Sequence, residues 1–212
     1  LSRLRQYKEE EVVAYEDYLK GTTNAIQSQV AKKIASNAAE YLAENVAPFE
    51  GKAKDRVAIP RVKMPELTPE ERVQSLYKEV NQGLSFEQAI TEAHRCLDCK
   101  NPTCVKGCPV NINIPGFIKR VEVGDVDGAA QVIQESSTLP AVCGRVCPQE
   151  KQCEAQCIHL KMGHEAVAIG YLERFVADNS QIESTKPEVS NGKKVAVVGS
   201  GPAGLAFAGD MA

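Results

Sequence analysis

Eight cysteines form the pattern in this sequence that most clearly carries chemistry. All of them lie between Cys96 and Cys157, in two groups of four. The groups are Cys96-x2-Cys99-x4-Cys104-x3-Cys108 and Cys143-x3-Cys147-x4-Cys153-x3-Cys157. Such short spacings let one loop place several thiolates around a single inorganic centre. Thiolates are soft ligands that favour iron–sulfur clusters and zinc, so the pattern predicts metal centres.

The spacing favours iron–sulfur clusters over the other uses of cysteine. A proline follows Cys108 and Cys147, as in ferredoxin loops, where the proline ends the cluster loop. Structural zinc usually shows paired C-x2-C knuckles, and only Cys96 and Cys99 form such a pair. Disulfides suit secreted proteins, and this sequence shows no signal peptide. We therefore expect two [4Fe–4S] clusters, with zinc and disulfides as the alternatives.

A glycine-rich turn near the end of the sequence predicts a dinucleotide site. We expect a short buried strand over Lys194–Val198, then Gly199, Gly201 and Gly204 in the order G-x-G-x-x-G, then a helix. These glycines allow a tight turn, the approach of a pyrophosphate and close packing of helix on strand. The form of the motif resembles FAD-binding proteins. The acidic residue that binds the ribose would lie beyond Ala212, so the nucleotide site is incomplete.

The elements that must position the cysteines are predicted to be short helices. A capping box of Thr68 and Glu71 starts one helix, and Ser85 with Gln88 starts another that ends near His94. Further helices are expected from near Pro115, from a cap at Asp125 or Asp127, and over residues 165–177. The predicted fold class is mainly α, a helical domain with two clusters followed by the first β–α unit of a Rossmann domain.

Composition and loop-forming residues divide the chain into four predicted parts. An apolar residue at every fourth position predicts a helix within residues 1–47, which either packs on its own domain or docks to a partner subunit. Residues 49–66 and 178–193 are expected to be linkers. The predicted boundaries are residues 1–65 for an N-terminal extension and linker, 66–180 for the iron–sulfur domain, 181–193 for a second linker and 194–212 for the truncated Rossmann domain.

The overall composition excludes several classes of function. Hydrophobic residues make up 43% of the chain, which is enough for a core, and the net charge of −3 does not suit a nucleic-acid partner. No run of 18 apolar residues predicts a membrane span. We expect a cytoplasmic protein. Because the sequence begins at Leu1 and stops inside an apolar segment, we also expect it to be part of something longer.

Three segments closely resemble a known family. They are EAHRCLDCKNPTCVKGCPVNINIPGFI, LPAVCGRVCPQEKQCEAQC and AIGYLERFVAD. They resemble the N-terminal iron–sulfur domain of the glutamate synthase small-subunit family. That family includes the large subunit of the NADH-dependent reduced-ferredoxin:NADP oxidoreductase and part of dihydropyrimidine dehydrogenase. The resemblance covers about residues 66–212, and residues 1–60 match no family that we can name.

The resemblance implies that the ligands of the two clusters interleave between the cysteine groups. One cluster would be held by Cys96, Cys99, Cys104 and Cys157. The other would be held by Cys108, Cys147, Cys153 and a non-cysteine ligand, for which Glu173 occupies the matching position. Cys143 would then be spare, and Cys143 in place of Glu173 stays open as the all-thiolate alternative.

The pattern around Glu173 supports a special role for this residue independently. Glu173 shares one helix face with Ile169 and Val176. A bare buried charge is costly, so we expect the carboxylate either to bind iron or to be paired. The alternative to iron is an ion pair with Arg145 or Arg120.

The resemblance implies electron transfer as the function. The clusters would pass electrons between a flavin (FAD), reduced by NAD(P)H, and a redox partner such as a glutamate synthase large subunit, a ferredoxin or a flavoprotein. Two clusters in series would convert a two-electron donor into a one-electron supply. No catalytic residue is predicted, because the sequence shows no triad or carboxylate pair. The alternative is a non-catalytic conducting or docking subunit of a larger redox complex.

Several histidine and basic side chains near the cysteines are expected to lie outside the set of ligands. His94, His159 and His164 have neither zinc nor catalytic spacing, so we expect them on the surface or behind the ligands. Arg95, Lys106 and Arg145 are expected to offset the negative charge of the clusters.

Overall fold

The computed structural model describes Val46, residues 49–182 and residues 192–211. The chain divides into two compact units, Leu1–Ala47 and Pro48–Ala212, and the description below concerns the second. The helix predicted within residues 1–47 lies outside the described residues, as do residues 183–191 of the predicted second linker. The predicted domain boundaries stay predictions.

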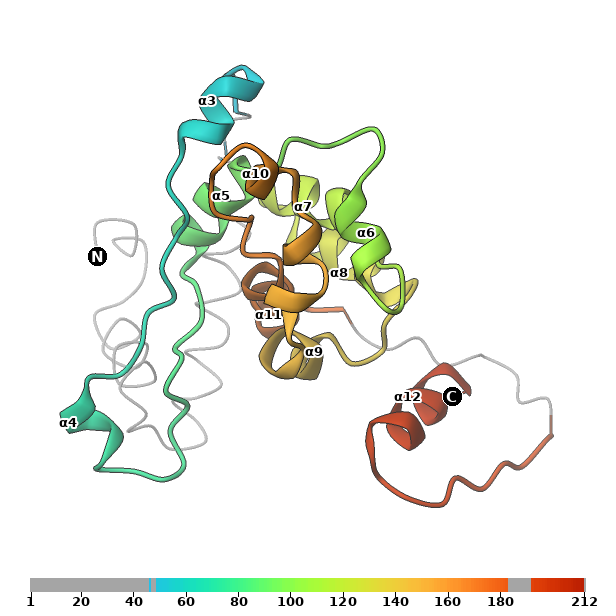
Figure 1. Cartoon of the computed structure of the whole chain (residues 1–212). Helices are drawn as coiled ribbons and strands as arrows, with labels where there is room; N and C mark the ends of the chain where they lie inside the picture. The colour runs from blue at the N-terminus through green and yellow to red at the C-terminus, as the bar shows by residue number, and fades with distance from the viewer. Residues whose placement is uncertain (1–45, 47–48, 183–191, 212) are drawn as a thin grey trace, which may run out of the picture. The chain divides into compact units, whose positions relative to one another are not determined.

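Short helices make up the described part of the second unit (Figure 1). In chain order they are α3 (Ala53–Ala58), α4 (Pro69–Arg72), α5 (Phe86–His94), α6 (Thr103–Gly107), α7 (Ile114–Glu122), α8 (Val126–Gln134), α9 (Pro140–Val146), η2 (Gln149–Lys151), η3 (Glu154–Gln156), α10 (Ile158–Lys161), α11 (Ile169–Asn179) and α12 (Pro202–Met211). The described ranges contain one isolated antiparallel bridge, between Glu66 and Asn81, and no strand. The prediction of a mainly α chain is confirmed, whereas the β–α unit is not formed.

Side-chain caps set the starts of several helices where the sequence predicted them. The Thr68 hydroxyl accepts the Glu71 N–H at the start of α4, and the Ser85 hydroxyl accepts the Gln88 N–H at the start of α5. Asp125 is the cap of α8. A cap depends on residues about three positions apart, so local sequence is enough to locate it.

α11 begins at residue 169, later than the predicted start near residue 165. The carboxylate of Glu92 accepts the N–H of Ala168 at 2.8 Å, and Arg95 donates to the carbonyl of Ala166 at 2.9 Å. In a longer helix the carbonyl of Ala166 would accept the N–H of Gly170. That N–H donates to Glu154 at 3.4 Å instead. The shorter helix is therefore a tertiary effect that a local pattern does not reveal.

The predicted extended linker over residues 49–66 is only partly correct. It contains α3, and it is attached to the helical bundle by two ion pairs. Arg56 binds Glu122 at 2.6 Å, and Arg61 binds Glu154 at 2.9 Å. Both partners lie far away in the sequence. The charged residues that suggested a linker therefore form direct ion pairs with the bundle.

The strand predicted over Lys194–Val198 does not form within the described ranges. Val195 is 59% exposed and Val198 is 99% exposed, so the segment is not buried either. A strand is stabilised by hydrogen bonds to a neighbouring strand, and the residues described here provide none. The helix predicted after the glycine turn is present as α12.

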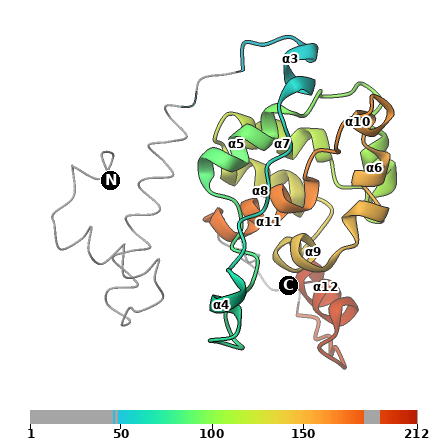
Figure 2. The same ribbon diagram turned by 60° about the vertical axis from the view of Figure 1, so that its left-hand side comes forward.

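The core lies between α5, α7, α8 and α11, which Figure 2 shows side by side. Phe117 and Ile118 of α7, Ile133 of α8, and Leu172 and Val176 of α11 are almost fully buried in it. Cys96, Cys153 and Cys157 belong to this core, and Cys104 and Cys108 pack against it. Among the described helices none is long and apolar enough to cross a membrane.

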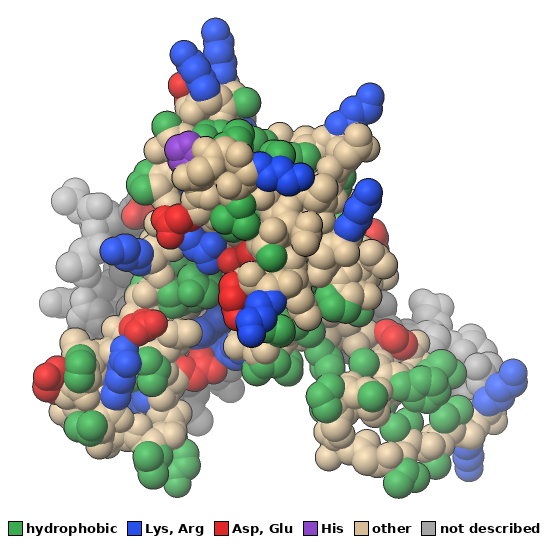
Figure 3. All heavy atoms as spheres, in the orientation of Figure 1, with side chains coloured by type: hydrophobic (Ala, Val, Ile, Leu, Met, Phe, Trp, Pro, Cys, Tyr) green, Lys and Arg blue, Asp and Glu red, His purple; other side chains and the backbone are tan. Residues whose placement is uncertain are grey.

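Residues 66–82 form an arm that leaves the bundle and returns to it. The N–H of Leu67 donates to the carbonyl of Val80 at 2.9 Å, which holds the two halves of the arm together. Figure 1 and Figure 2 both show α4 at the far end of this arm. Hydrophobic side chains are exposed there (Figure 3), including Val73, Leu76 and Tyr77.

Candidate metal centres

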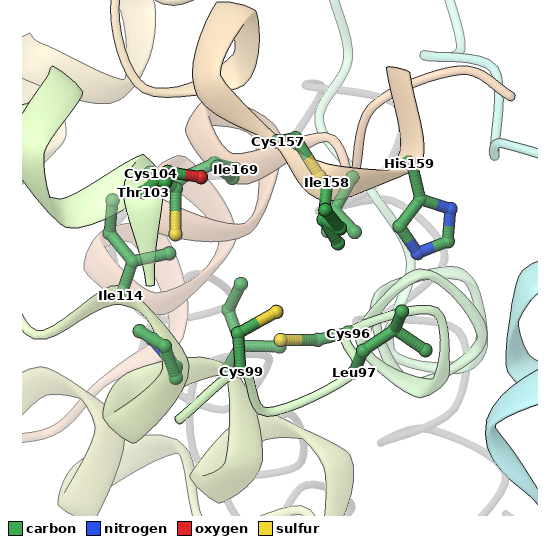
Figure 4. A pocket seen from close by; sticks show the side chains of 13 residues that line it. Cys96, Leu97, Cys99, Thr103, Cys104, Ile114, Cys157, Ile158, His159 and Ile169 are labelled. Atoms are coloured by element: carbon green, nitrogen blue, oxygen red, sulfur yellow. The ribbon is translucent and has the colours of Figure 1, made fainter. Parts of the chain in front are cut away.

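Four cysteines from both halves of the cysteine region line a single pocket. We call them the first ligand group: Cys96, Cys99, Cys104 and Cys157. Figure 4 shows their sulfur atoms facing a common space. The remaining wall is mainly apolar and includes Leu97, Ile114, Ile158 and Ile169. The structure therefore brings together the same four cysteines that the resemblance assigns to one cluster.

Local backbone geometry places the first two of these thiols. Cys96 follows directly on the end of α5, where its N–H donates to the carbonyl of Ala93 at 3.0 Å. Asp98 has φ of 50°, a left-handed conformation that is uncommon for residues other than glycine. This bend lets Cys96 and Cys99 both reach the pocket.

Close contact between two loops adds the last thiol of the first ligand group. A Cβ atom at Gly107 would lie 2.6 Å from the carbonyl oxygen of Gln152, so only glycine permits this approach. Nearby, the hydroxyl of Thr103 donates to the carbonyl of Gln156. The contact brings η3 against α6, and Cys157 at the end of η3 thereby joins Cys104 of α6.

Burial changes the acidity of the thiols in this pocket. It raises the pKa of Cys96 to about 11 and that of Cys104 to about 12. The pKa of Cys99 is also raised, again mainly by burial. Without a cation nearby these groups stay protonated, so a metal centre must displace their protons when it binds.

The other cysteines gather around Glu173. We call Cys108, Cys147, Cys153 and Glu173 the second ligand group. The pKa of Cys147 is raised to about 11, mainly by burial and in part by the proximity of Cys143, Glu173 and Cys108. Burial likewise raises the pKa of Cys153 to about 12, with smaller effects from Glu154, Cys108 and Glu173. Charges act in this way over short distances, so the members of this group share one region with Cys143 beside them.

The packing of α9 on α11 joins this second set of side chains. Cys143 lies in α9, Cys147 ends it, and Glu173 lies in α11. A Cβ atom at Gly144 would lie 2.6 Å from the backbone nitrogen of Arg174. The two helices are therefore in direct backbone contact next to the candidate ligands.

Glu173 is buried and incompletely bonded. It is 7% exposed, and its Oε1 atom has no hydrogen-bond partner in the part of the chain that the structure describes. Burial raises the pKa of this carboxyl to about 7. The predicted alternative of an ion pair is wrong, because Arg120 binds Asp125 and Arg145 binds two other carboxylates.

The donor atoms fit iron–sulfur clusters. Each ligand group offers at least three thiols. The second also has a carboxylate oxygen that lacks a hydrogen-bond partner among the described residues. The described residues hold no group of three His, Cys, Asp or Glu side chains close enough to share one metal ion, as zinc would require. The ligands of a cluster stand further apart, because each binds a different iron atom. All eight cysteines are free thiols, so no disulfide forms.

Of the two places expected for His159, the surface or behind the ligands, the structure shows the second. Its side chain is almost fully buried and lines the pocket of the first ligand group. Nε2 donates to the carbonyl of Arg95 at 2.9 Å, and Nδ1 has no partner among the described residues. Burial lowers the pKa of His159, so the ring is neutral near pH 7. The only signal in the sequence was its place two residues after Cys157.

The two arginines expected to offset cluster charge are already paired with carboxylates. Arg95 binds Glu92 inside the core, where both side chains are almost fully buried. Arg145 binds Glu79 and Asp178. Carboxylates of the protein already balance their positive charge, so the main role of both arginines is to hold the fold together.

The glycine motif keeps part of its predicted geometry. Gly199 has φ of 102°, as a tight turn requires, and a Cβ atom at Gly204 would lie 2.5 Å from the carbonyl oxygen of Gly199. A Cβ atom at Gly201 would meet nothing within 4 Å. The nucleotide-binding role of Gly199, Gly201 and Gly204 stays a prediction, because the strand that should precede them is not formed.

A family of known proteins and several individual relatives match this chain. A family described as dihydropyrimidine dehydrogenase domain II, 4Fe-4S cluster, matches residues 72–185. The glutamate synthase [NADPH] small chain of Escherichia coli (strain K12) is 43% identical over 136 residues, which are 62% of this chain and 29% of the relative. The corresponding small chain of Halomonas elongata is 38% identical over 148 residues, which are 68% of this chain and 31% of the relative.

A third relative carries a different name. The NAD-dependent dihydropyrimidine dehydrogenase subunit PreT of Escherichia coli (strain K12) is 39% identical over 136 residues, which are 62% of this chain and 32% of the relative. This chain therefore matches less than a third of the length of these three relatives.

Proposed function

Because this chain belongs to the 4Fe-4S family of dihydropyrimidine dehydrogenase domain II, as its resemblance to the glutamate synthase small-subunit family predicted, we propose that it transfers electrons through two [4Fe–4S] clusters. One observation carries the proposal. The fold brings cysteines from two separate loops together at two places. Four thiols line one pocket, and three more lie near a buried carboxylate. Two-cluster ferredoxins share ligands between loops in the same manner.

The first ligand group, Cys96, Cys99, Cys104 and Cys157, would hold one cluster. The second ligand group, Cys108, Cys147, Cys153 and Glu173, would hold the other. The unbonded and buried Oε1 atom of Glu173 supports its role, because iron would supply the partner that the carboxylate lacks among the described residues. Cys143 is then the side chain left over.

The side chains around the first ligand group exclude water from the thiols and bring positive charge close to Cys96. Apolar side chains such as Ile114 and Ile169 exclude water from the thiols. Lys119 and Arg56 each approach the carbonyl of Cys96 at 3.4 Å and share the carboxylate of Glu122, so cationic groups lie close to this thiol. When bound, each cluster carries one electron at a time, whereas a flavin takes two electrons from NAD(P)H. The chain positions and tunes the clusters for that relay.

We place this chain within an NAD(P)H-dependent flavoprotein oxidoreductase of the glutamate synthase type, with FAD at Gly199, Gly201 and Gly204. The names of the relatives support it, since they include NADPH-dependent glutamate synthase and NAD-dependent dihydropyrimidine dehydrogenase. The partner would be a larger redox subunit, a ferredoxin or a flavoprotein, in the cytoplasm. The second candidate is a conducting subunit without catalysis of its own, and the description of PreT as a subunit favours it.

Metal analysis tests the proposal. Anaerobically purified protein should hold about eight iron and eight labile sulfide per chain. Cys104→Ser and Cys153→Ser should each remove a different cluster, so that about four of each remain. Zinc without sulfide would contradict the proposal, and so would the loss of both clusters from either variant. Bleaching of the clusters by NADPH in the flavin-containing protein would separate the flavoprotein from the conducting subunit.

A further inference from the structure

A network of ion pairs connects three elements beside the second ligand group. Arg145 on α9 binds Glu79 of the arm through Nε at 2.8 Å. Its two terminal nitrogens bind the carboxylate oxygens of Asp178 on α11 at 2.9 and 2.8 Å. Arg174 on α11 binds Glu79 at 2.6 Å and Asp178 at 3.3 Å. We call Glu79, Arg145, Arg174 and Asp178 the Glu79 network.

The two arginines of the network stand on the backbone segments that carry the candidate ligands. Arg145 lies between Cys143 and Cys147, and Arg174 directly follows Glu173. Glu79 bridges both arginines from a segment that contributes no ligand. A shift of the backbone at either arginine therefore moves a neighbouring ligand with it.

Hydrophobic burial does little to hold α9 in place. Among its seven residues only Gly144 is buried, and Val142 and Val146 are 43% and 71% exposed. A helix this short is not stable by itself, and a glycine provides no side chain to pack. Directional polar contacts therefore add to the close backbone contact at Gly144 in fixing the position of α9 on α11.

The geometry of the network suits that task. An isolated, exposed ion pair contributes little to stability, and the side chain of Glu79 is 54% exposed. However, Arg145 binds both of its carboxylates through two contacts each, and the side chain of Arg174 is only 7% exposed. Forked contacts of this kind restrict orientation as well as distance. The carbonyl of Asn81 accepts a further bond from Arg174 at 3.0 Å, which holds the base of the arm.

We propose that Glu79 is a positioning residue for the second cluster, because it fixes α9 against α11 and so keeps Cys147 and Glu173 at the spacing that one cluster needs. This inference rests on the proposed function of the second ligand group. Glu79 touches no ligand in this scheme and acts only through Arg145 and Arg174. The loss of its charge should therefore affect the second cluster and leave the first unchanged.

The test compares Glu79→Gln with Glu66→Gln in anaerobically purified protein. Glu66 is a matched control, since it lies on the same arm in an exposed ion pair with Arg72. Glu79→Gln should change the electron paramagnetic resonance signal of the second cluster. A chelator should remove iron from that cluster at least about tenfold faster, a change equivalent to about 1.4 kcal/mol. In Glu79→Gln, the first cluster should keep the wild-type signal and rate of iron loss. In Glu66→Gln, both clusters should keep them.

Two further variants make the outcome decisive. Cys153→Ser identifies the signal of the second cluster by removing it. Arg145→Lys should behave like Glu79→Gln, because lysine keeps the charge but cannot form the forked contacts. An unchanged second cluster in Glu79→Gln would overturn the inference, and so would equal loss of both clusters, since that would show a general structural role. A wild-type protein without a second cluster would instead overturn the proposed function, before any variant is compared.

Discussion

At the scale of single residues, the second site holds one donor more than a four-iron cluster requires. Cys108, Cys147 and Cys153 lie near Glu173, and Cys143 lies beside Cys147. Glu173 is the donor with an unsatisfied buried oxygen among the described residues. A thiol tolerates burial without a partner far better than a carboxylate does. We therefore expect the carboxylate to be the fourth ligand and the Cys143 thiol to be the spare group.

This reasoning gives a prediction for two substitutions. Cys143→Ser should keep about eight iron atoms per chain, whereas Glu173→Ala should make the second cluster labile and shift its electron paramagnetic resonance signal. Iron analysis and spectroscopy of the two variants, prepared side by side, check it. If Cys143→Ser lost a cluster and Glu173→Ala did not, the all-thiolate alternative would be correct.

A second prediction concerns pH. The pKa of Cys96 is raised to about 11 and that of Cys104 to about 12 by burial, so both thiols of the apoprotein are protonated at neutral pH. Binding to iron must release these protons, so the apparent affinity for the cluster should weaken by about tenfold per pH unit for each protonated thiol as the pH falls. Reconstitution at several values between about pH 7 and 9, with proton release measured by calorimetry, tests this expectation. Uptake that did not vary with pH would show that the thiols are already ionised.

At the scale of elements, the contact between α9 and α11 decides whether the second ligand group exists. A Cβ atom at Gly144 would lie 2.6 Å from the nitrogen and 2.8 Å from the Cα atom of Arg174, and backbone atoms cannot move aside easily. Gly144→Ala should therefore push α9 away, destabilise the protein by about 1–3 kcal/mol and release the second cluster first. Gly201→Ala is the control, because a Cβ atom there meets nothing within 4 Å. Iron content and denaturant unfolding of both variants measure the difference.

At the scale of the whole molecule, a buried ion pair ties the segments around the first ligand group together. Glu92 and Arg95 are 0% and 1% exposed. Glu92 accepts the N–H groups of Val62 at 2.7 Å and Ala168 at 2.8 Å, so one carboxylate joins α5 to two distant segments. Arg95 directly precedes Cys96, and this network therefore also holds the first thiol of the site.

Removal of the buried carboxylate should cost much more than removal of an exposed one. Glu92→Gln leaves the guanidinium of Arg95 without its counter-charge in the core, which we expect to destabilise the fold by about 3–5 kcal/mol. Glu66→Gln breaks an exposed pair and should change stability by less than about 1 kcal/mol. Denaturant unfolding of both variants checks the contrast. Similar small effects in both would show that water reaches the Glu92 pair.

Features that depend on near neighbours in the chain could be predicted from the sequence alone. The caps Thr68, Ser85 and Asp125 act over three residues, and the burial of Glu173 follows from its place on an apolar helix face. The number and spacing of the cysteines were enough to predict iron–sulfur clusters, and the family match supports that prediction. Each of these signals lies within a few residues of the feature that it predicts.

Only the tertiary structure decided the features that depend on distant partners. The segment predicted as a linker contains α3 and is attached by Arg56 to Glu122. α11 starts late because the carbonyl of Ala166 and the N–H of Gly170, which a longer helix would pair, bind Arg95 and Glu154 instead. The strand before Gly199 is not formed, since a strand needs a neighbour that the described residues do not supply. Ion pairs, backbone contacts and strand pairing all join residues far apart in the chain, and no local pattern encodes which of them will meet.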